Sequence, residues 1–421
     1  MNRRSFLGGS ALAMALPSLL LARRGQAAPA DGELRFVFVF AAGGWDTTRV
    51  FAPVFDNPDV DMEGLAEPAS EGGISWVDHP ERPRVSAFMR GNAHRMVVVN
   101  GILVRAIAHE ICTMLALTGG SSGLDPDWAT ILAHAQADRY TLPHLVVGGP
   151  SFSGEMVTSV ARTGSSSQLA GLLSGDILQW NDRYIGSPSA PVESAVDRFV
   201  RRRAVARAGS SHSPVDQALA STFAAATQAA QGLKDYQYIM DFSAGTSLSD
   251  QARVAVDALR LGLCRSVTLG FAGGGGLGWD SHADNDATQS PLFEQLFIGL
   301  GELMGLLDAT PGEDGVSLAD RTVVVVMSEM ARTPQLNATL GKDHWPYTSM
   351  MLLGPGLAHG RVLGGYDGGF GGAPVDLASG DLYEGGSLIS AEAVGAALLE
   401  LAGIDPGDWV SGTEPLRGIL G

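Results

Sequence analysis

Cysteine is nearly absent from this chain of 421 residues, and charged residues are few. The two cysteines, Cys112 and Cys264, allow at most one disulfide bond, and their spacing does not resemble a zinc-binding pair. Two free buried thiols and one bridge are both compatible with the sequence. Charged residues make up only 17% of the chain, and the formal net charge is −17. Because such an acidic surface repels phosphate backbones, we expect no nucleic-acid partner.

The N-terminus has the pattern of a bacterial export signal. Arg3 and Arg4 stand in the twin-arginine motif Asn-Arg-Arg-Ser-Phe-Leu, and an apolar run follows through Leu21. This run is short for a membrane-spanning helix, and small residues favour cleavage after Ala27. We therefore expect a twin-arginine signal peptide over residues 1–27, which would engage the twin-arginine export machinery and deliver a folded protein to the periplasm or beyond. A retained anchor helix is the alternative, but we expect no permanent membrane anchor.

Glycine and apolar residues, in contrast, are plentiful, with 55 glycines and a hydrophobic content of 45%. Four consecutive valines at 323–326 are typical of a strand buried on both faces. Strands are expected at 34–40, 95–100, 145–148, 266–271, 322–327 and 350–353. Helices are expected at 125–135, 182–231, 249–263, 290–307 and 391–401. This alternation predicts an α/β fold with a doubly wound, mainly parallel sheet and helices on both faces. We expect a single domain over 28–421, with a helical insertion around 182–231.

Acidic residues and histidines follow several of the expected strands. The carboxyl ends of parallel strands meet at one edge of a sheet, where α/β folds build ligand sites. Carboxylates and imidazoles together suit a zinc, manganese or magnesium ion. Each residue alone is more often structural than functional, but their recurrence at strand ends predicts a shared metal site. The predicted ligands are Asp46, Asp280, His282, Glu329, Asp343 and His344.

Several short motifs also resemble those of a known family. Besides the twin-arginine start, they are Gly43-Gly44-Trp45-Asp46, Gly278-Trp279-Asp280-Ser281-His282, Met327 to Thr333, and Lys342-Asp343-His344-Trp345. In order and spacing they resemble the exported bacterial family catalogued as domain of unknown function 1501, over almost the whole mature chain.

That family is grouped with the alkaline phosphatase and sulfatase superfamily. The resemblance therefore implies an alkaline phosphatase-like α/β sandwich, which in that superfamily binds two divalent metals beside a Ser, Thr or modified Cys nucleophile. It also implies that five of the predicted ligands occupy the metal-binding positions of the fold. These are Asp46, Asp280, His282, Glu329 and His344.

Two features depart from the superfamily pattern. Met330 stands directly after the late-strand acid, where the phosphatases have a histidine, and Ala108 stands where a polar nucleophile is expected. Thr113 is the nearest hydroxyl, and Cys112 lacks the sulfatase Cys-x-Pro-x-Arg context. His109 is therefore the candidate catalytic residue, as an acid, a base or a metal ligand. A histidine that is merely hydrogen-bonded beside the sheet is the alternative.

Two functions follow from these observations. The first is an exported metal-dependent hydrolase that uses one or two divalent ions on a small anionic phosphate or sulfate ester, with water as the attacking group. The second is a non-catalytic exported binding or assembly protein on the same fold, with a degenerate metal site. An open acidic pocket with converging carboxylates and imidazoles would favour the enzyme. A filled pocket around Glu329 would favour the binding protein.

Overall fold

The computed structural model describes residues 32–163, 189–210, 213–236, 239–312 and 315–421, together with 169, 173, 179–180 and 183–184. The expected signal peptide, residues 1–27, lies outside these residues and stays a prediction. Among the helices that are described, none is both long and apolar enough to cross a membrane.

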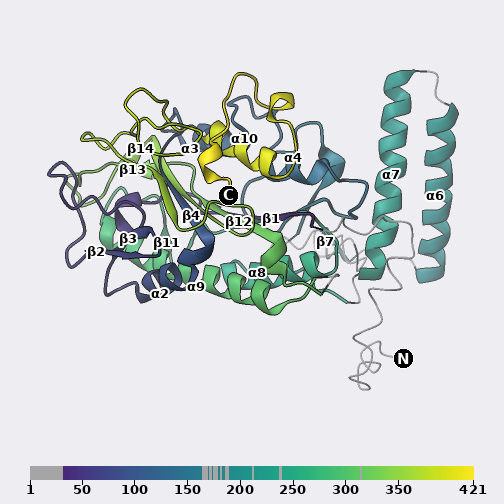
Figure 1. Cartoon of the computed structure of the whole chain (residues 1–421). Coiled ribbons are helices and arrows are strands. Elements are labelled where there is room, and N and C mark those ends of the chain that lie inside the picture. Colours follow the sequence, from purple (N-terminus) through teal and green to yellow (C-terminus); the bar gives the residue numbers. More distant parts are fainter. Residues whose placement is uncertain are drawn as a thin grey trace.

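An eight-stranded sheet forms the centre of the molecule (Figure 1). Its spatial order is β16-β4-β15-β12-β1-β9-β5-β6, and all neighbouring pairs are parallel except those that involve β15. The predicted doubly wound, mainly parallel sheet is therefore confirmed. Its strands are β1 (Arg35–Phe40), β4 (Met96–Leu103), β5 (His144–Val146), β6 (Val160–Arg162), β9 (Ser266–Gly270), β12 (Thr322–Met327), β15 (Tyr347–Leu353) and β16 (Arg361–Gly364).

Helices cover both faces of this sheet, as expected (Figure 1). Successive side chains of a strand point to opposite faces, so the residues of β1 divide between two apolar cores. Val37 and Val39 belong to one core, whereas Phe36, Phe38 and Phe40 belong to the other. Burying each such side chain contributes about 1.5–3 kcal/mol. Helices α2 (Pro83–Asn92), α8 (Leu248–Arg260) and α9 (Asn285–Ala309) pack in the first core, and α3 (His109–Thr118), α4 (Trp128–His134) and α10 (Ala391–Leu401) in the second.

Three predicted helix starts are wrong, two of them because a different residue caps the helix. Helix α4 is capped by Asp127, whose carboxylate accepts from the backbone N–H of Thr130 at 2.7 Å, rather than by Asp125. Helix α8 is capped by Ser247, two residues earlier than expected. Helix α9 begins at Asn285, so the predicted start at Pro291 lies inside the helix. A cap stabilises a helix only where its side chain reaches the free N–H groups, which composition alone does not reveal.

The helical insertion expected around 182–231 is a hairpin of two long helices. Helices α6 (Ala190–Ser210) and α7 (Pro214–Tyr236) lie side by side and stand beyond one end of the sheet (Figure 1). Among the described side chains of the hairpin, Leu233 and Tyr236 at the end of α7 are the ones that join the main core. The division of the chain into a single domain with an insertion stays a prediction.

Short antiparallel hairpins complete the fold. The most important joins β13 (Ala331–Arg332) to β14 (His344–Trp345), because it returns the chain to the end of β12. The others are β2 (Glu67–Glu71) with β3 (Ile74–Asp78), β7 (Gln179–Trp180) with β8 (Arg183–Tyr184), and β10 (Gly273–Gly274) with β11 (Leu277–Gly278). Cys112 and Cys264 are both buried and free, which settles the alternative between thiols and a bridge.

Candidate metal centre

The centre lies where the carboxyl ends of β1 and β12 meet. The turn after β1 depends on two glycines with positive φ, Gly43 at +126° and Gly44 at +77°. A Cβ atom on Gly43 would lie 3.0 Å from the Cβ of Trp279, and one on Gly44 would lie 2.9 Å from the Cγ of Met330. Only glycine accommodates this close approach without strain. The turn thereby places the Gly43 N–H 2.8 Å from Glu329 Oε1.

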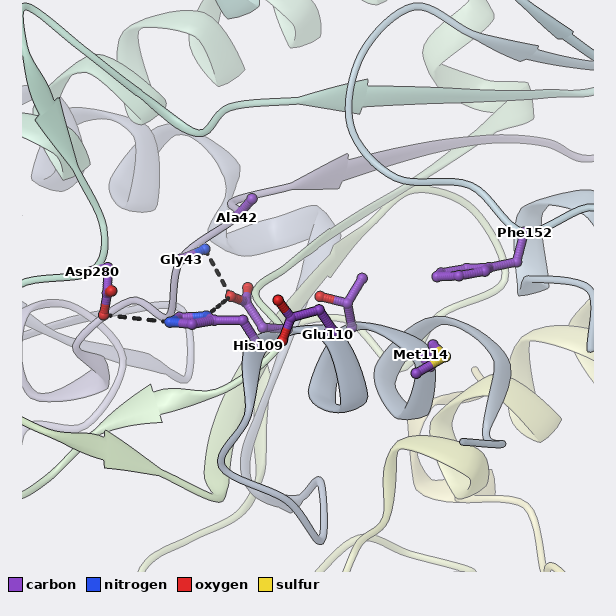
Figure 2. A pocket seen from close by; sticks show the side chains of 9 residues that line it. Ala42, Gly43, His109, Glu110, Met114, Phe152 and Asp280 are labelled. Atoms are coloured by element: carbon purple, nitrogen blue, oxygen red, sulfur yellow. Dashed lines mark hydrogen bonds and ion pairs between the residues drawn. The ribbon is translucent and has the colours of Figure 1, made fainter. Parts of the chain in front are cut away.

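Three imidazoles converge on one carboxylate oxygen of Asp280. Asp280 Oδ1 lies 3.4 Å from His109 Nε2, 3.1 Å from His282 Nε2 and 3.2 Å from His344 Nε2. His109, Asp280 and His344 each offer a ligand atom within 4.8 Å of the others. Figure 2 shows His109 and Asp280 pointing toward one another at the pocket. Ligands of a tetrahedral zinc ion at about 2.1 Å lie roughly 3.4 Å apart, close to the separations from Asp280.

The outer nitrogen of each imidazole is held by a hydrogen-bond acceptor. His109 Nδ1 donates to Glu329 Oε1 at 2.8 Å, and His282 Nδ1 donates to Asp343 Oδ1 at 2.9 Å. His344 Nδ1 donates to the backbone carbonyl of residue 107 at 2.6 Å. Because a carboxylate or carbonyl only accepts, each Nδ1 carries a hydrogen, and the Nε2 atom of each ring is directed toward Asp280. This is the usual arrangement behind metal-binding histidines.

Three imidazole nitrogens lie 3.1–3.4 Å from the Asp280 oxygen, and a proton or a cation can lie between atoms at this range. His282 Nε2 and His344 Nε2 are only 3.0 Å apart, so they need a shared proton or a cation. His109 Nε2 is buried and forms no hydrogen bond with any described residue. The donors therefore fit a divalent ion with nitrogen and oxygen ligands.

Charge around the centre also keeps Asp280 ionised. Burial alone would raise the pKa of Asp280, but hydrogen bonding and charge from Arg332 and hydrogen bonding from His344 lower it to about 2. Arg332 Nη2 donates to Asp280 Oδ1 at 2.6 Å, and the same buried guanidinium also binds the backbone carbonyls of Gly43 and Gly44. The hydrogen bond from His109 to Glu329 raises the pKa of His109.

The predicted ligands take three different places. Asp280, His282 and His344 come together with His109 at the centre. Glu329 and Asp343 lie behind the histidines and orient them, and Glu329 Oε2 also accepts from Ser328 Oγ at 3.0 Å. Arg332 was not among the predicted site residues, yet it belongs to the centre; its position between Glu329 and the returning β14 was the available signal.

Asp46 lies outside this group and is sealed in the interior. Its Oδ1 accepts from the N–H and the hydroxyl of Thr48, and its Oδ2 accepts from Asn285 and from Lys342 Nζ at 2.9 Å. Arg49 lies 3.6 Å away. Burial alone would raise the pKa of Asp46, but Lys342, Arg49 and the hydrogen bonds hold it well below its usual range. Side chains of the protein thus already bind the Asp46 carboxylate, which the resemblance implied to be a metal ligand.

An open pocket of about 560 Å³ adjoins the centre (Figure 2). Phe152 and Met114 lie at the end opposite His109 and Asp280. Among the described lining residues, Thr113 offers the only hydroxyl, and neither serine nor cysteine is present. Burial raises the pKa of Cys112 to about 12, and the charge of Glu329 adds to the effect. A thiol with this pKa is a poor nucleophile at neutral pH. The lining residues are Ala42, Gly43, His109, Glu110, Thr113, Met114, Phe152, Asp280 and Glu329.

The fold and the centre define an α/β protein with a candidate metal site at the carboxyl edge of its sheet. The family model "Protein of unknown function (DUF1501)" matches residues 33–379, so the chain belongs to this family and the predicted membership is confirmed. A search of curated proteins gives no match.

Solved structures that resemble the chain do so only distantly. The lipoteichoic acid synthase LtaP from Listeria monocytogenes is 10% identical, with 96% of this chain and 82% of that one covered and a TM-score of 0.42. The PsFucS1 sulfatase from Pseudoalteromonas sp. is 10% identical, covering 93% and 72%, with a TM-score of 0.38. A protein in the alkaline phosphatase superfamily from Vibrio parahaemolyticus is 8% identical, covering 90% and 69%, with a TM-score of 0.32. No residue role is transferred at these values.

Proposed function

We propose that this protein is an exported hydrolase of phosphate or sulfate esters that works with a divalent metal ion. The observation that carries the proposal is the convergence of three imidazole Nε2 atoms on Asp280 Oδ1 beside an open pocket. His109, Asp280, His282 and His344 would hold the ion. When bound, such an ion polarises an ester oxygen and lowers the pKa of a water molecule.

The surrounding residues prepare the ligands for this role. Glu329 and Asp343 keep the Nε2 lone pairs of His109 and His282 directed inward, and Arg332 holds the Asp280 carboxylate in place. Because these partners are fixed by the fold, little reorganisation is needed when a charged ligand arrives. The absence of serine and cysteine among the described pocket residues favours water as the attacking group.

The lack of serine and cysteine among the described pocket residues also supports the second candidate function, a binding or assembly protein. A non-catalytic binding or assembly protein would keep the ion as a structural element and would need no nucleophile. The two candidates agree on metal binding and differ on turnover. Measuring metal content and ester hydrolysis on the same preparations therefore separates them.

The test compares the wild-type chain with His109→Ala and His344→Ala variants after equilibration with zinc, manganese or magnesium. We expect about one ion per wild-type chain, as a closed set of protein ligands would bind. Each variant should lose at least tenfold in affinity, because one ligand is removed. His94→Ala, which removes an exposed histidine elsewhere, is the matched control.

Hydrolysis is then assayed with phosphate and sulfate monoesters on the metal-loaded chains. Turnover by the wild type that falls in both variants and persists in His94→Ala supports the enzyme. Metal binding without turnover supports the binding protein. Equal metal content in all four chains would show that the centre is not a metal site and would overturn both.

A further inference from the structure

The hairpin of α6 and α7 exposes a row of apolar side chains. On α6, Val196 and Phe199 are 51% and 53% exposed, and on α7, Leu219 and Phe223 are 64% and 54% exposed. Residues spaced three or four apart share one face of a helix, so each pair forms a stripe. Isolated exposed apolar residues are ordinary, whereas aligned stripes on neighbouring helices mark an interaction surface. Val192 and Val215 extend the two stripes.

The two stripes meet in a groove that is rimmed by arginine. Phe199 of α6 and Phe223 of α7 line the same hollow of about 930 Å³, together with Arg202, Arg203 and Arg207. The Arg203 guanidinium lies 5.9 Å from the centre of the Phe199 ring. Aromatic and cationic groups therefore occupy the same surface.

The charge of this surface opposes that of the whole chain. From residue 198 to residue 210, α6 has five arginines and no acidic residue, whereas the chain has a net charge of −17. The acidic residues of α6, Glu193 and Asp197, are both bound to Lys234 of α7, each at 2.6 Å. They lie on the side of α6 that faces its partner helix, so they do not neutralise the outer surface.

We propose that the α6–α7 hairpin docks peripherally on a membrane surface that contains anionic phospholipid. A helix surface that carries both exposed apolar side chains and cations binds such a membrane by placing the apolar side chains among the acyl chains and the cations near the phosphates. The hairpin stands beyond the end of the sheet, where it can meet a surface (Figure 1). This inference does not depend on the proposed hydrolase.

The arginines also favour a membrane, rather than a second copy of the chain, as the partner of this surface. Symmetric pairing of two hairpins through their apolar stripes would bring two arginine rows together, because a two-fold interface joins identical surfaces. Like charges at such range oppose association. An anionic bilayer satisfies both the apolar and the cationic side chains.

The experiment is flotation of the chain with vesicles of phosphatidylcholine alone or mixed with phosphatidylglycerol. It uses the full chain and a chain that begins at Ala28, so that the N-terminal apolar run is controlled. We expect binding only to the anionic vesicles, with loss at about 0.5 M salt as the charges are screened. Equal binding to both kinds of vesicle would contradict an electrostatic site.

The decisive variant carries Arg198→Glu, Arg202→Glu and Arg203→Glu. Each basic residue near an anionic surface strengthens binding about fivefold, so this variant should bind at least about a hundredfold more weakly. The matched control carries Arg84→Glu, Arg253→Glu and Arg260→Glu, which make the same change in charge on α2 and α8. If both variants bind alike, the hairpin is not the site.

A second variant, Phe199→Ser with Phe223→Ser, tests the apolar part of the surface. It should weaken vesicle binding at least tenfold without changing the circular dichroism spectrum or the midpoint of thermal unfolding, since both rings are exposed. Sedimentation velocity completes the test. Dimers that this variant abolishes, without any vesicle binding by the wild type, would overturn the proposal in favour of a second copy.

Discussion

The tripeptide Gly-Trp-Asp occurs twice in this protein, at Gly44 to Asp46 and at Gly278 to Asp280, with opposite outcomes for its aspartate. Trp45 and Trp279 are both fully buried, and both rings pack against Phe293 of α9, with ring centres 6.1 and 4.9 Å from it. The side chain of Asp46 is completely buried, whereas that of Asp280 is 49% exposed.

The partners of the two aspartates explain the difference in chemistry. Asp46 is neutralised by the ammonium of Lys342 and lies near the guanidinium of Arg49, so the chain itself supplies the cations beside this carboxylate. Asp280 is bound by one buried guanidinium, that of Arg332, and otherwise faces imidazoles, whose charge depends on protonation and which can also donate a lone pair to a metal. The same local motif therefore builds a closed structural ion pair in one place and an open candidate ligand in the other. Burial and partner type decide which one results.

The largest expected effect is on the closed pair. Lys342→Met leaves the Asp46 carboxylate buried without its nearest cation, so the free energy of unfolding should fall by about 3–5 kcal/mol. Asp280→Asn, at the open site, keeps an oxygen that can accept from Arg332, and should change it by less than about 1 kcal/mol, as expected for an ion pair with a half-exposed partner. Urea unfolding of the two variants and the wild type checks this difference. Similar losses for both variants would contradict the proposed contrast.

The second expected effect is that the free energy of unfolding depends on pH through the ionisation of Asp46. Its pKa is lowered in the folded chain, so its contribution is fully present above the unfolded value of about 3.9 and is lost as the pH falls toward the folded value. Across that window the loss should approach about 1.4 kcal/mol per pH unit.

The control for this measurement is the double variant Asp46→Asn with Lys342→Met, which removes both charges of the pair. Unfolding by urea is followed at several values of pH for the wild type and the double variant. The difference between their stabilities should shrink with acidification. A difference that stays constant between neutral pH and the acid range would show that Asp46 is not held ionised.

The smallest expected effect is a difference in stability between alanine substitutions at Gly44 and at Gly278, the glycines of the two tripeptides. Gly44→Ala should cost about 1–2 kcal/mol, because φ is +77° and the new Cβ would press on Met330. Gly278→Ala should lie within about 0.5 kcal/mol of the wild type, since its nearest neighbour would be 3.7 Å away. Thermal unfolding of both variants measures the contrast, and a cost at Gly278 equal to that at Gly44 would contradict it.

The sequence predicted the architecture well because the buried strands have an unambiguous composition. The valine run of β12 and the Phe-Val alternation of β1 both lie where expected, and Asp280, His282 and His344 lie together in space. Helix starts were less accurate. Asp284, which precedes α9, has a positive φ of 48° and makes no side-chain cap, so no sequence signal marks that start.

The place of Asp46 could not be predicted from its own neighbourhood. Its main partner, Lys342, lies far along the chain and reaches it only after the loop between β13 and β14 has folded back. The sequence near Asp46 resembles that near Asp280, and only three-dimensional packing distinguishes a sealed carboxylate from an open one. The same limit applies to Arg332, whose partner Asp280 lies 52 residues earlier in the chain.

The segments that build the centre are spread along most of the chain. They run from Gly43 through His109 and Asp280 to His344, and the last of them arrives on the β13–β14 hairpin. A nascent or truncated polypeptide that lacks this hairpin therefore has no complete set of ligands. The predicted signal peptide would export the protein already folded. In that case, an ion bound at the centre would show that synthesis and folding were complete before translocation.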